Sequence, residues 1–438
     1  MLPILEWQRM TAAERDAALR RPSPSARLQA AAAAREIIEA VRAGGDRALY
    51  TLGQQFDGVT LNSLSVSDAE IAAAENSLAV EARRALERAI ENVTRFHEAQ
   101  VAAPLVVDTM PGVRCERRVV PVRAVGLYVP AGSAPLPSTA IMLGVPAQIA
   151  GCPVRVLCTP PRRDGSADPA VLFVARRCGI QRVLKIGGAQ AVAAMAYGTE
   201  SVPKVDKIFG PGNAWVTAAK QLVAQDAAGA AIDLPAGPSE VLVIADDTAR
   251  ADFVSADLLA QAEHSPDAHV LLVTTSRRLA DQTRAQIAAQ LQRLSRREIM
   301  QQSLAESRVV LVTDLQEAID VSNAYGPEHL ILECENPRGW LEHVTSAGSV
   351  FLGTWSPEPI GDYCSGTNHV LPTDGHARAF SGLSLLDFTK RITVQELSAD
   401  GLRGLGPTAR TLALLEGLDA HANAVSIRLD ALAGGATG

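Results

Sequence analysis

Hydrophobic residues recur at helical spacing through the first part of the chain. Residues 26–56 and 80–100 carry apolar side chains three and four positions apart among alanine and charged residues, so both segments are predicted to be helices. From about residue 117 the pattern changes, and short β-branched runs alternate with helical stretches. A run at 240–246, for example, precedes a predicted helix at 250–264. Strands that alternate with helices over this length predict parallel sheets with crossover helices.

The predicted elements indicate more than one domain. A chain of 438 residues is too long for one ordinary core, and helical ends flank the alternating region. We therefore expect the α/β class, with two incomplete Rossmann-like parallel-sheet domains, a helical N-terminal arm and a helical C-terminal tail. The expected boundaries are an arm at 1–26, a first domain built from 27–126 and 239–380, an inserted domain at 127–238 and a tail at 381–438.

Composition narrows the class of protein. Hydrophobic residues make up 47% of the chain and charged residues 20%, which is typical of a globular protein and argues against disorder. The formal charge is −7 and no basic run occurs, so nucleic acid is not an expected partner. The apolar segment at 140–151 is shorter than a membrane span, and the first ten residues lack the pattern of a secretory signal. We expect a protein without a membrane partner.

Six cysteines are scattered along the chain without a CxxC pair. This spacing indicates neither a disulfide framework nor a thiolate zinc site. A reducing, cytoplasmic location is therefore expected.

The stretch "GPEH" at 326–329 places an acid beside an imidazole. The Gly-Pro pair ends the predicted helix at 314–324, and the apolar run 330–332 is predicted to be a buried strand. Carboxylate and imidazole groups are easily tuned to transfer protons near neutral pH, so Glu328 and His329 are candidate catalytic residues. A solvated turn at a loop end explains the same residues, and this segment alone does not decide between the two.

Two glycine-rich turns follow predicted strands, "GG" at 187–188 and "GPGN" at 210–213. Glycines there let a phosphate or a ribose approach backbone N–H groups at a helix N-terminus. Tight strand-to-helix turns also use glycine for structural reasons, and no G-x-G-x-x-G follows a strand in this chain. A nucleotide site and a structural turn both remain open.

Gln261 and His264 stand three positions apart at the end of a predicted amphipathic helix, so their side chains share one face of its last turn. That spacing suits two ligands of one metal, although a polar helix end has the same pattern. Asp362 and His421 are further candidate ligands. Two imidazoles, a carboxylate and an amide oxygen form a mixed N/O set that suits Zn²⁺ or a neighbouring ion such as Mn²⁺ or Co²⁺.

Seven segments, taken together and in order, resemble those of a known family. They read "VGLYVP", "DLPAGPSEVLVIAD", "DLLAQAEH", "YGPEHL", "GSVFLG", "GDYCSGTNHVLPT" and "SGLSLLDFTKR". In order and spacing they resemble the histidinol dehydrogenase family, from about residue 25 to the C-terminal tail. The resemblance implies a zinc-dependent enzyme that ends histidine biosynthesis. It implies that L-histidinol is oxidised to L-histidine in two NAD-dependent steps, through an aldehyde that stays bound.

The resemblance also implies roles for particular residues. Glu328 and His329 match the acid–base pair of the family, and the first domain is expected to hold the metal. The other matching positions are the metal ligands Gln261, His264, Asp362 and His421, the NAD contacts Tyr128, Gln190 and Asn213 in the inserted domain, and the substrate contacts Ser239, His369 and Glu416. The metal ligands and the acid–base pair are expected to contact substrate as well. His421 is expected to come from the partner subunit of a homodimer, through the tail, with one zinc per subunit.

The chemistry of the substrate agrees with these roles. Histidinol carries an imidazole and an amine, both good ligands for a borderline metal, so a zinc with open positions can hold it beside the nicotinamide. A neutral His329 is expected to take the alcohol proton. Glu328 is expected to activate the water that hydrates the aldehyde before the second hydride transfer.

Two positions need separate comment. In Pro130-Ala131-Gly132, Ala131 stands where the family usually has glycine, so a positive φ in this expected NAD loop becomes less favourable. Cys364, two residues after Asp362, invites a thiohemiacetal mechanism. Its neighbourhood lacks an obvious cation to activate the thiol, so a buried packing role is expected instead.

Three other functions fit parts of the pattern. A related NAD-dependent dehydrogenase acting on another amino alcohol or a sulfonate is one, but Glu416 and His421, expected to recognise the histidinol amine and complete the metal site, are both present. A zinc hydrolase in which Glu328 activates a metal-bound water leaves both glycine turns unexplained. A non-catalytic binding protein needs no adjacent Glu-His pair.

Overall fold

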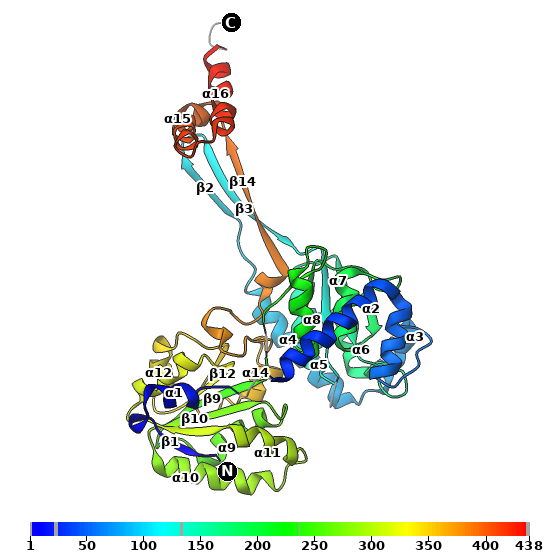
Figure 1. Cartoon of the computed structure of the whole chain (residues 1–438), viewed down its shortest axis with the longest axis vertical. Coiled ribbons are helices and arrows are strands. Elements are labelled where there is room, and N and C mark those ends of the chain that lie inside the picture. Colours follow the sequence, from blue (N-terminus) through cyan, green and yellow to red (C-terminus); the bar gives the residue numbers. More distant parts are fainter. Residues whose placement is uncertain (1, 22–24, 132–134, 236, 435–438) are drawn as a thin grey trace. The chain divides into compact units, whose positions relative to one another are not determined.

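The computed structural model describes residues 2–21, 25–131, 135–235 and 237–434. It confirms the α/β class, with two parallel sheets and their covering helices (Figure 1). The chain divides into a larger compact unit, Met1–Gln100 with Val122–Phe388, and a smaller one, Val101–Pro121 with Thr389–Gly438. The domain boundaries expected at residues 26, 126, 238 and 380 stay a prediction.

A six-stranded parallel sheet forms one core of the larger unit, in the order β1-β11-β10-β9-β12-β13. Its strands are β1 (Ile4–Glu6), β9 (Glu240–Ala245), β10 (His269–Thr274), β11 (Arg308–Leu311), β12 (His329–Glu333) and β13 (Ser349–Leu352). Strands β9, β10 and β12 are buried along their whole length, because helices cover both faces of the sheet. The helices of this part are α9 (Ala251–Ala262), α10 (Arg277–Leu291), α11 (Arg297–Glu306), α12 (Leu315–Tyr325), α13 (Pro337–Trp340) and α14 (Glu358–Tyr363).

The N-terminal arm begins with a strand that its sequence pattern did not reveal. Ile4–Glu6 pair in parallel with Val309–Leu311, so β1 is an edge strand of the six-stranded sheet. Helix α1 (Ala12–Ala18) follows, and the Thr11 hydroxyl and the Glu14 carboxylate cap its N-terminus reciprocally. The arm therefore adds an edge strand to the sheet before its helix.

A five-stranded parallel sheet forms the other core of the larger unit, in the order β6-β5-β4-β7-β8. Its strands are β4 (Ala124–Tyr128), β5 (Val154–Thr159), β6 (Arg182–Lys185), β7 (Lys207–Phe209) and β8 (Ala231–Ile232). The helices around it are α2 (Ser25–Phe56), α3 (Asp68–Ser77), α4 (Val80–Glu98), α5 (Pro137–Ile149), α6 (Pro169–Arg177), α7 (Gly188–Tyr197) and α8 (Ala214–Gln225). Ile37 and Leu49 of α2 pack in one cluster with Val156 and Leu184, so the first long helix shares its core with this sheet.

The smaller unit contains an antiparallel sheet in the order β14-β3-β2 and two helices. Its elements are β2 (Leu105–Met110), β3 (Val113–Pro121), β14 (Thr389–Leu397), α15 (Ala399–Leu415) and α16 (Asp419–Gly434). The expected helical tail thus contains the strand β14, whose sequence "TKRITVQEL" includes the β-branched residues Thr389, Ile392, Thr393 and Val394. Leu412, Leu415 and Ile427 are exposed on the two helices.

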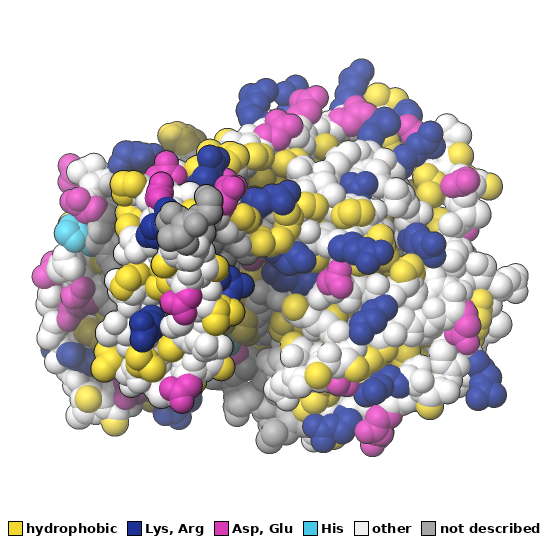
Figure 2. All heavy atoms as spheres, turned by 90° about the horizontal axis from the view of Figure 1, so that it is seen from above, with side chains coloured by type: hydrophobic (Ala, Val, Ile, Leu, Met, Phe, Trp, Pro, Cys, Tyr) yellow, Lys and Arg dark blue, Asp and Glu magenta, His cyan; other side chains and the backbone are white. Residues whose placement is uncertain are grey.

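The described surface has mixed character. On the face shown in Figure 2, lysine and arginine side chains are scattered among acidic, hydrophobic and uncharged ones. Among the described residues, no helix combines the length and the apolar character that crossing a membrane requires.

Candidate active site

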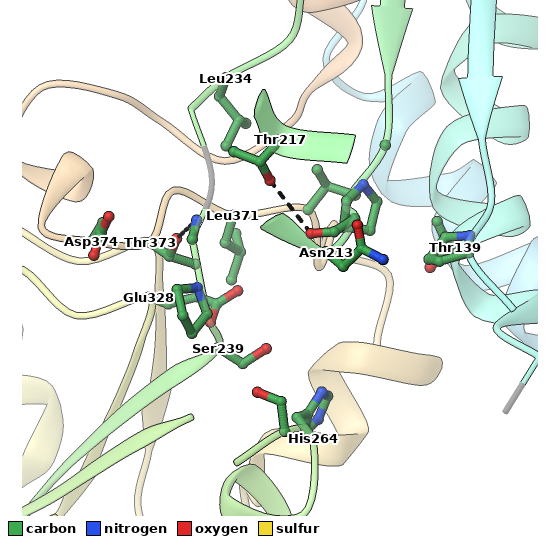
Figure 3. A pocket seen from close by; sticks show the side chains of 18 of the residues that line it. Thr139, Asn213, Thr217, Leu234, Ser239, His264, Glu328, Leu371, Thr373 and Asp374 are labelled. Atoms are coloured by element: carbon green, nitrogen blue, oxygen red, sulfur yellow. Dashed lines mark hydrogen bonds between the residues drawn. The ribbon is translucent and has the colours of Figure 1, made fainter. Parts of the chain in front are cut away.

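A cavity of about 630 Å³ lies in the larger unit and is lined by residues from both parallel sheets (Figure 3). Ser239, His264 and Glu328 stand on the side of the six-stranded sheet. Thr139 and Asn213 stand on the side of the five-stranded sheet. Segments more than 180 residues apart in the chain, such as those at 139 and 328, therefore contribute to one cavity.

The two sheets meet this cavity with opposite edges. Ser239 and Glu328 directly precede β9 and β12, so the six-stranded sheet contributes the amino ends of its strands. Pro130 lies two residues after β4 and Gly210 directly follows β7, so the five-stranded sheet contributes the carboxyl ends of its strands. Only the second arrangement is the usual one for ligand sites in open α/β sheets.

The turn before β12 explains how Glu328 reaches the cavity. Gly326 adopts a φ of 63° at the end of α12, a conformation that glycine tolerates, and its N–H donates to Ser322 O at 2.8 Å. On the neighbouring strand, Gly348 N–H donates to Pro327 O at 2.9 Å. A Cβ at Gly348 would stand only 2.6 Å from Glu328 O, so the close approach requires glycine there.

The side chains of Glu328 and His329 are both held by the backbone of Glu240, the first residue of β9. Glu240 N–H donates to Glu328 Oε2 at 2.8 Å, and His329 Nδ1 lies 3.1 Å from Glu240 O. Because a carbonyl oxygen only accepts, Nδ1 of His329 carries a proton. The other ring nitrogen, Nε2, faces Asp362 Oδ1 at 3.3 Å.

Burial and charge shift the pKa of both groups. Burial raises the pKa of Glu328 above its ordinary value, although His329 opposes the shift. Burial by itself lowers the pKa of His329, but the carboxylates of Glu328 and Asp362 outweigh it and the pKa rises. Two adjacent titratable groups with displaced pKa values inside a cavity are the usual mark of a general acid–base site.

A group that can hold a metal lies beside this pair. One ligand atom from each of His264, Glu358 and Asp362 falls within 4.8 Å of the others. Glu358 and Asp362 are four positions apart on α14, so they share one face of that helix. His264 lines the cavity and is exposed to it. The protein around its ring lowers the pKa of His264 by desolvation, although the charge of Asp362 opposes this shift.

Glu358 is the member of this group that sequence reasoning missed. Its side chain is 2% exposed, and burial raises its pKa strongly. Gln261, the expected ligand, lies next to it. In one orientation of the Gln261 amide, the side-chain nitrogen donates to Glu358 Oε1 at 3.3 Å. The side-chain oxygen then accepts from Glu240 N–H at 2.8 Å. In the sequence, the four-residue spacing of Glu358 and Asp362 could have indicated that both carboxylates face one metal, but only if 358–363 is taken to be a helix.

His369 connects the metal group to the five-stranded sheet. Its Nδ1–H donates to Asp362 O at 2.8 Å, and its Nε2 lies 3.3 Å from Thr139 Oγ1. Burial lowers the pKa of His369 despite the opposing charge of Asp362. Together with Ser239, a second expected substrate contact, this imidazole lines the cavity.

The three expected NAD contacts do not lie together. Asn213 lines the cavity and caps α8, accepting from Val216 N–H at 3.1 Å. Tyr128 is 3% exposed and its hydroxyl accepts from Gly188 N–H at 3.0 Å, inside the sheet's core. Gln190 is also buried and borders a separate, much smaller cavity.

The loop after β4 contains Ala131, at which the sequence made a positive φ less favourable. Among the described residues, the non-glycine positions with positive φ are Asn336 and Asp374, so Ala131 does not adopt that conformation. Gly132 lies outside the described residues.

The two expected site residues of the tail belong to the smaller unit. Glu416 caps the C-terminus of α15, and its N–H donates to Leu412 O at 3.1 Å. His421 stands in the first turn of α16. Both residues are exposed within their unit and free of the packing that fills a core.

Cys364 has a structural environment. The residue is half-buried and packs against the hydrophobic cluster of the five-stranded sheet. Its carbonyl oxygen accepts from Asn92 Nδ2 at 2.8 Å. These contacts agree with a packing role.

The chain is similar to known proteins along nearly its whole length. The sequence profile of the family described as histidinol dehydrogenase matches residues 19–429. The histidinol dehydrogenase of Xanthomonas euvesicatoria pv. vesicatoria (strain 85-10) is 56% identical over 428 residues, 98% of this chain and 99% of that protein. That of Vibrio vulnificus (strain YJ016) is 55% identical over 426 residues, 97% of this chain and 98% of that protein. The crystal structure of histidinol dehydrogenase from Elizabethkingia anophelis superposes with a TM-score of 0.94 and 45% identity, covering 98% of each chain.

Proposed function

The chain belongs to the histidinol dehydrogenase family of oxidoreductases, and from this premise we propose that it oxidises L-histidinol to L-histidine with NAD, through a bound histidinaldehyde. This reaction is the last step of histidine biosynthesis. One observation carries the proposal: the Glu328–His329 pair lines the same cavity as His264 and Asp362, with Glu358 buried beside them. An acid–base pair and a metal-capable group are the two parts that the reaction needs.

The residues present fit one zinc ion per subunit. Imidazole and carboxylate are donors that zinc prefers, and a nearly inaccessible carboxylate such as Glu358 calls for a positive partner. We propose that His264, Asp362 and Gln261 hold the ion, with Glu358 as a further carboxylate and His421 of a partner subunit. When bound, zinc supplies positive charge that orients the imidazole and amine of histidinol, and NAD accepts a hydride in each oxidation.

In the first oxidation, His329 acts as the base. Its Nδ1–H is fixed on Glu240 O, so Nε2 is the nitrogen that exchanges a proton. The carboxylates of Glu328 and Asp362 raise the pKa of His329, and a zinc ion held by Asp362 would offset this charge and favour the neutral imidazole that acts as a base. The alcohol carbon loses a hydride while the hydroxyl proton passes to Nε2, and histidinaldehyde forms. The burial of His329 excludes bulk water from this transfer.

In the second oxidation, Glu328 acts on water. Its carboxylate is held through Oε2 by Glu240 N–H, beside the imidazole. Glu328 takes a proton from the water that adds to the aldehyde, and the hydrate then loses its hydride and a proton to give the carboxylic acid. The raised pKa of Glu328 suits a group that must accept and release a proton near neutral pH.

The NAD contacts are proposed at the five-stranded sheet. Support comes from the turn at 210–213, which follows β7 directly and lines the cavity at the N-terminus of α8. Backbone N–H groups at such a terminus bind phosphate oxygens. Asn213 is the contact that the cavity supports best, whereas Tyr128 and Gln190 must act from the buried layer beneath it.

We also propose a cytoplasmic homodimer in which the tail completes the partner's site. Exposed Leu412, Leu415 and Ile427 on α15 and α16 support a buried interface for the smaller unit. Glu416 would then meet the substrate amine and His421 the zinc of the other subunit. The six cysteines are all free, which agrees with a reducing compartment.

The decisive experiment follows NADH absorbance after L-histidinol, NAD and zinc are added to the purified protein, with histidine measured separately. We expect two NADH for each histidine, because alcohol and aldehyde are oxidised in turn. One NADH with accumulation of free histidinaldehyde would contradict the four-electron reaction. No NADH at all would contradict the proposed substrate.

A further inference from the structure

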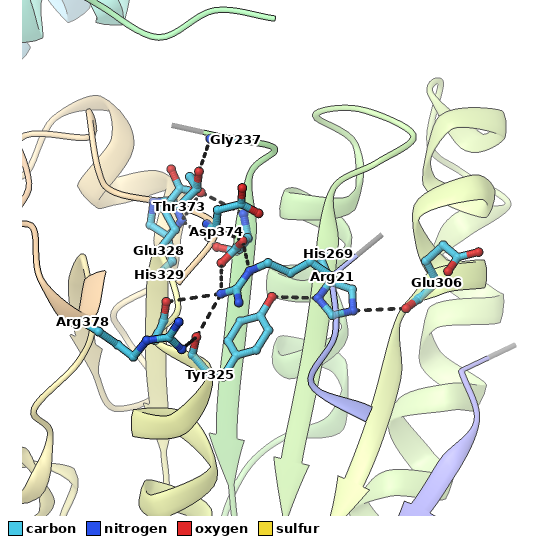
Figure 4. Close-up of polar contacts among 12 residues, drawn as sticks. Arg21, Gly237, His269, Glu306, Tyr325, Glu328, His329, Thr373, Asp374 and Arg378 are labelled. Atoms are coloured by element: carbon cyan, nitrogen blue, oxygen red, sulfur yellow. Dashed lines mark hydrogen bonds and ion pairs between the residues drawn. The ribbon is translucent and has the colours of Figure 1, made fainter. Parts of the chain in front are cut away.

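Arg21, at the end of the N-terminal arm, reaches both segments that hold the acid–base pair (Figure 4). Its Nη2 donates to Glu240 Oε2 at 2.8 Å and to Tyr325 O at 3.0 Å, and its Nε donates to Glu240 Oε1. Glu240 begins β9, and Tyr325 ends α12 three residues before Glu328. One guanidinium therefore bridges the start of one strand and the turn that leads into the next.

Glu240 transmits this bridge to the reacting side chains. Its carboxylate binds Arg21 and accepts from Asp374 N–H at 2.8 Å, while its backbone N–H and carbonyl hold Glu328 and His329. The residue is only 1% exposed. Whatever fixes the Glu240 carboxylate therefore also fixes the two backbone atoms that orient the acid–base pair.

A rigid layer lies beneath Arg21. The guanidinium carbon stands 3.9 Å from the centre of the Tyr325 ring, and the Tyr325 hydroxyl donates to His269 Nδ1 at 2.7 Å. His269 Nε2–H in turn donates to Glu306 O at 3.1 Å. Burial lowers the pKa of His269 to about 3, so the ring is neutral and its two nitrogens have fixed roles. Each polar group of this layer thus has a partner that holds it in place.

We propose that Arg21 is a positioning residue for the Glu328–His329 pair. The inference rests on the proposed function, since it assigns the N-terminal arm a part in that same reaction. A planar guanidinium can hold a carboxylate and a backbone carbonyl at one fixed separation, which the point charge of a lysine cannot do. Without it, the start of β9 and the turn before β12 lose their common anchor, and the pair is no longer held in a productive geometry.

The main test compares Arg21→Met with the matched control Arg20→Met, an exposed neighbour in the same arm. Misplacement of reacting groups by about 1 Å can lower a reaction rate on the order of 100-fold. We therefore expect kcat of Arg21→Met to fall about 10- to 100-fold. The KM values and the zinc content should stay within about threefold of the parent, because Arg21 bonds to Glu240 and Tyr325 and not to the proposed metal ligands. Arg21→Lys should also have a lower kcat, because a lysine cannot hold the carboxylate and the carbonyl at one fixed separation. Parental kcat in both Arg21 variants would overturn the proposal.

A second variant separates positioning from loss of folding. Arg21→Met leaves the Glu240 carboxylate buried without its cation, which destabilises the protein. The double variant Arg21→Met/Glu240→Gln removes both charges, so its Tm should recover toward the parental value while kcat stays low. Recovery of kcat together with Tm would mean that Arg21 acts only on stability, and the proposal would be wrong.

A double-mutant cycle asks whether Arg21 acts through the pair. In a His329→Ala background, Arg21→Met should cause little further loss of the first hydride transfer, because the group that it positions is already gone. An undiminished additional loss would contradict the inference.

A readout independent of turnover keeps the two proposals distinguishable. In spectra of protein labelled with ¹⁵N-histidine, the Nδ1 proton of His329 should be protected from exchange with water in the parent and in Arg20→Met. Its signal should be weaker in Arg21→Met, because the proton exchanges faster. If the parent forms no NADH from histidinol, the proposed function fails whatever these spectra show. If the parent is active and the Nδ1–H signal is unchanged in Arg21→Met, the positioning role fails alone.

Discussion

The two parallel sheets present opposite edges to the same cavity, and their helix ends differ accordingly. At the carboxyl edge of the five-stranded sheet, α8 begins at Ala214 with its N-terminus toward the cavity. At the amino edge of the six-stranded sheet, α9 ends at Ala262 beside His264, and α12 ends at Tyr325 beside the guanidinium of Arg21. Helix N-termini attract anions and C-termini attract cations.

This difference supports the proposal that one cavity serves both NAD and a metal. In the proposed complex the carboxyl edge would offer backbone N–H groups to the phosphates of NAD, with few side chains involved. The amino edge offers terminal carbonyls and the side chains of Ser239, His264 and Glu328, which suit a metal and proton transfer. Changes at one edge should therefore affect chemistry and metal, whereas changes at the other should affect NAD.

The largest expected effect comes from the acid–base pair at the amino edge. His329→Ala should lower the first hydride transfer from histidinol about 10²–10⁴-fold, the usual contribution of a positioned base. Glu328→Gln, which cannot accept a proton, should mainly slow the oxidation of supplied histidinaldehyde. Rapid-mixing measurements of NADH with each substrate separate the two steps.

The control for both variants is retention of zinc and of NAD affinity, because the two residues are adjacent and a change in one can displace the other. If Glu328→Gln oxidises the aldehyde at the parental rate with both bound, the water-activating role belongs to another residue.

The next effect concerns the metal. His264→Asn and Glu358→Gln should each weaken zinc binding by about 10–100-fold, since ligands and the groups that hold them contribute on that scale. Chelator competition measures the affinity, and NAD binding should be unchanged because the turn at 210–213 is intact. Parental zinc affinity in Glu358→Gln would show that this carboxylate is not part of the site. Full activity of a metal-free preparation would exclude a metal role altogether.

A smaller effect is expected at the carboxyl edge. Asn213→Ala removes the cap of α8, and such caps contribute about 0.5–2 kcal/mol. We expect KM for NAD to rise by up to about tenfold with unchanged zinc content, as a loosened helix start binds the dinucleotide less well. A change in zinc content with unchanged NAD affinity would reverse the assignment of the two edges.

The smallest effect concerns the unused carboxyl edge of the six-stranded sheet. Burial, reinforced by Asp257 and Asp252, raises the pKa of Glu333 to about 7, from an ordinary 4.5. The folded protein therefore holds this proton more tightly than the unfolded chain does. The contribution of Glu333 to stability is then fully present below about pH 4.5 and declines as the pH rises through 7.

Glu333→Gln should thus make Tm depend less steeply on pH between 5 and 8, and raise Tm by a few degrees at the upper end, on the order of 2–4 °C per kcal/mol. The matched control is Glu335→Gln, an exposed position two residues on, which should leave the profile unchanged. Parallel profiles for the parent and Glu333→Gln would contradict the raised pKa.

Local patterns were enough to predict part of this molecule. The α/β class followed from strand and helix periods. The segment "GPEH" marked Glu328 and His329 as candidates, and the family resemblance was needed to favour a catalytic pair over a solvated turn. The four-residue spacing of Glu358 and Asp362 is equally local, but it carries meaning only on a helix, and α14 has six residues after a proline, too few for a clear period.

Other features depend on contacts that no local pattern contains. β1 has three residues, and its partner lies some 300 positions away, so only the assembled sheet defines it as a strand. The same holds for the two sheet edges at the cavity. Strand prediction gives the order of the strands along the chain, but which edges face each other depends on packing between the sheets. The positions matching NAD contacts at Tyr128 and Gln190 likewise gave no sign that both side chains are buried.

The pairing of β1 with β11 has a consequence for the order in which the chain folds. The strands β4 to β8 lie within 124–232, so the five-stranded sheet can close once those residues have left the ribosome. Ile4–Glu6 must wait until Val309–Leu311 are made, which at about 5–20 residues per second takes roughly 15–60 seconds. Throughout that interval the apolar residues of the N-terminal arm lack their native cover. Nascent chains stalled before residue 311 should therefore depend on chaperones through their first twenty residues, although these are the earliest to be synthesised.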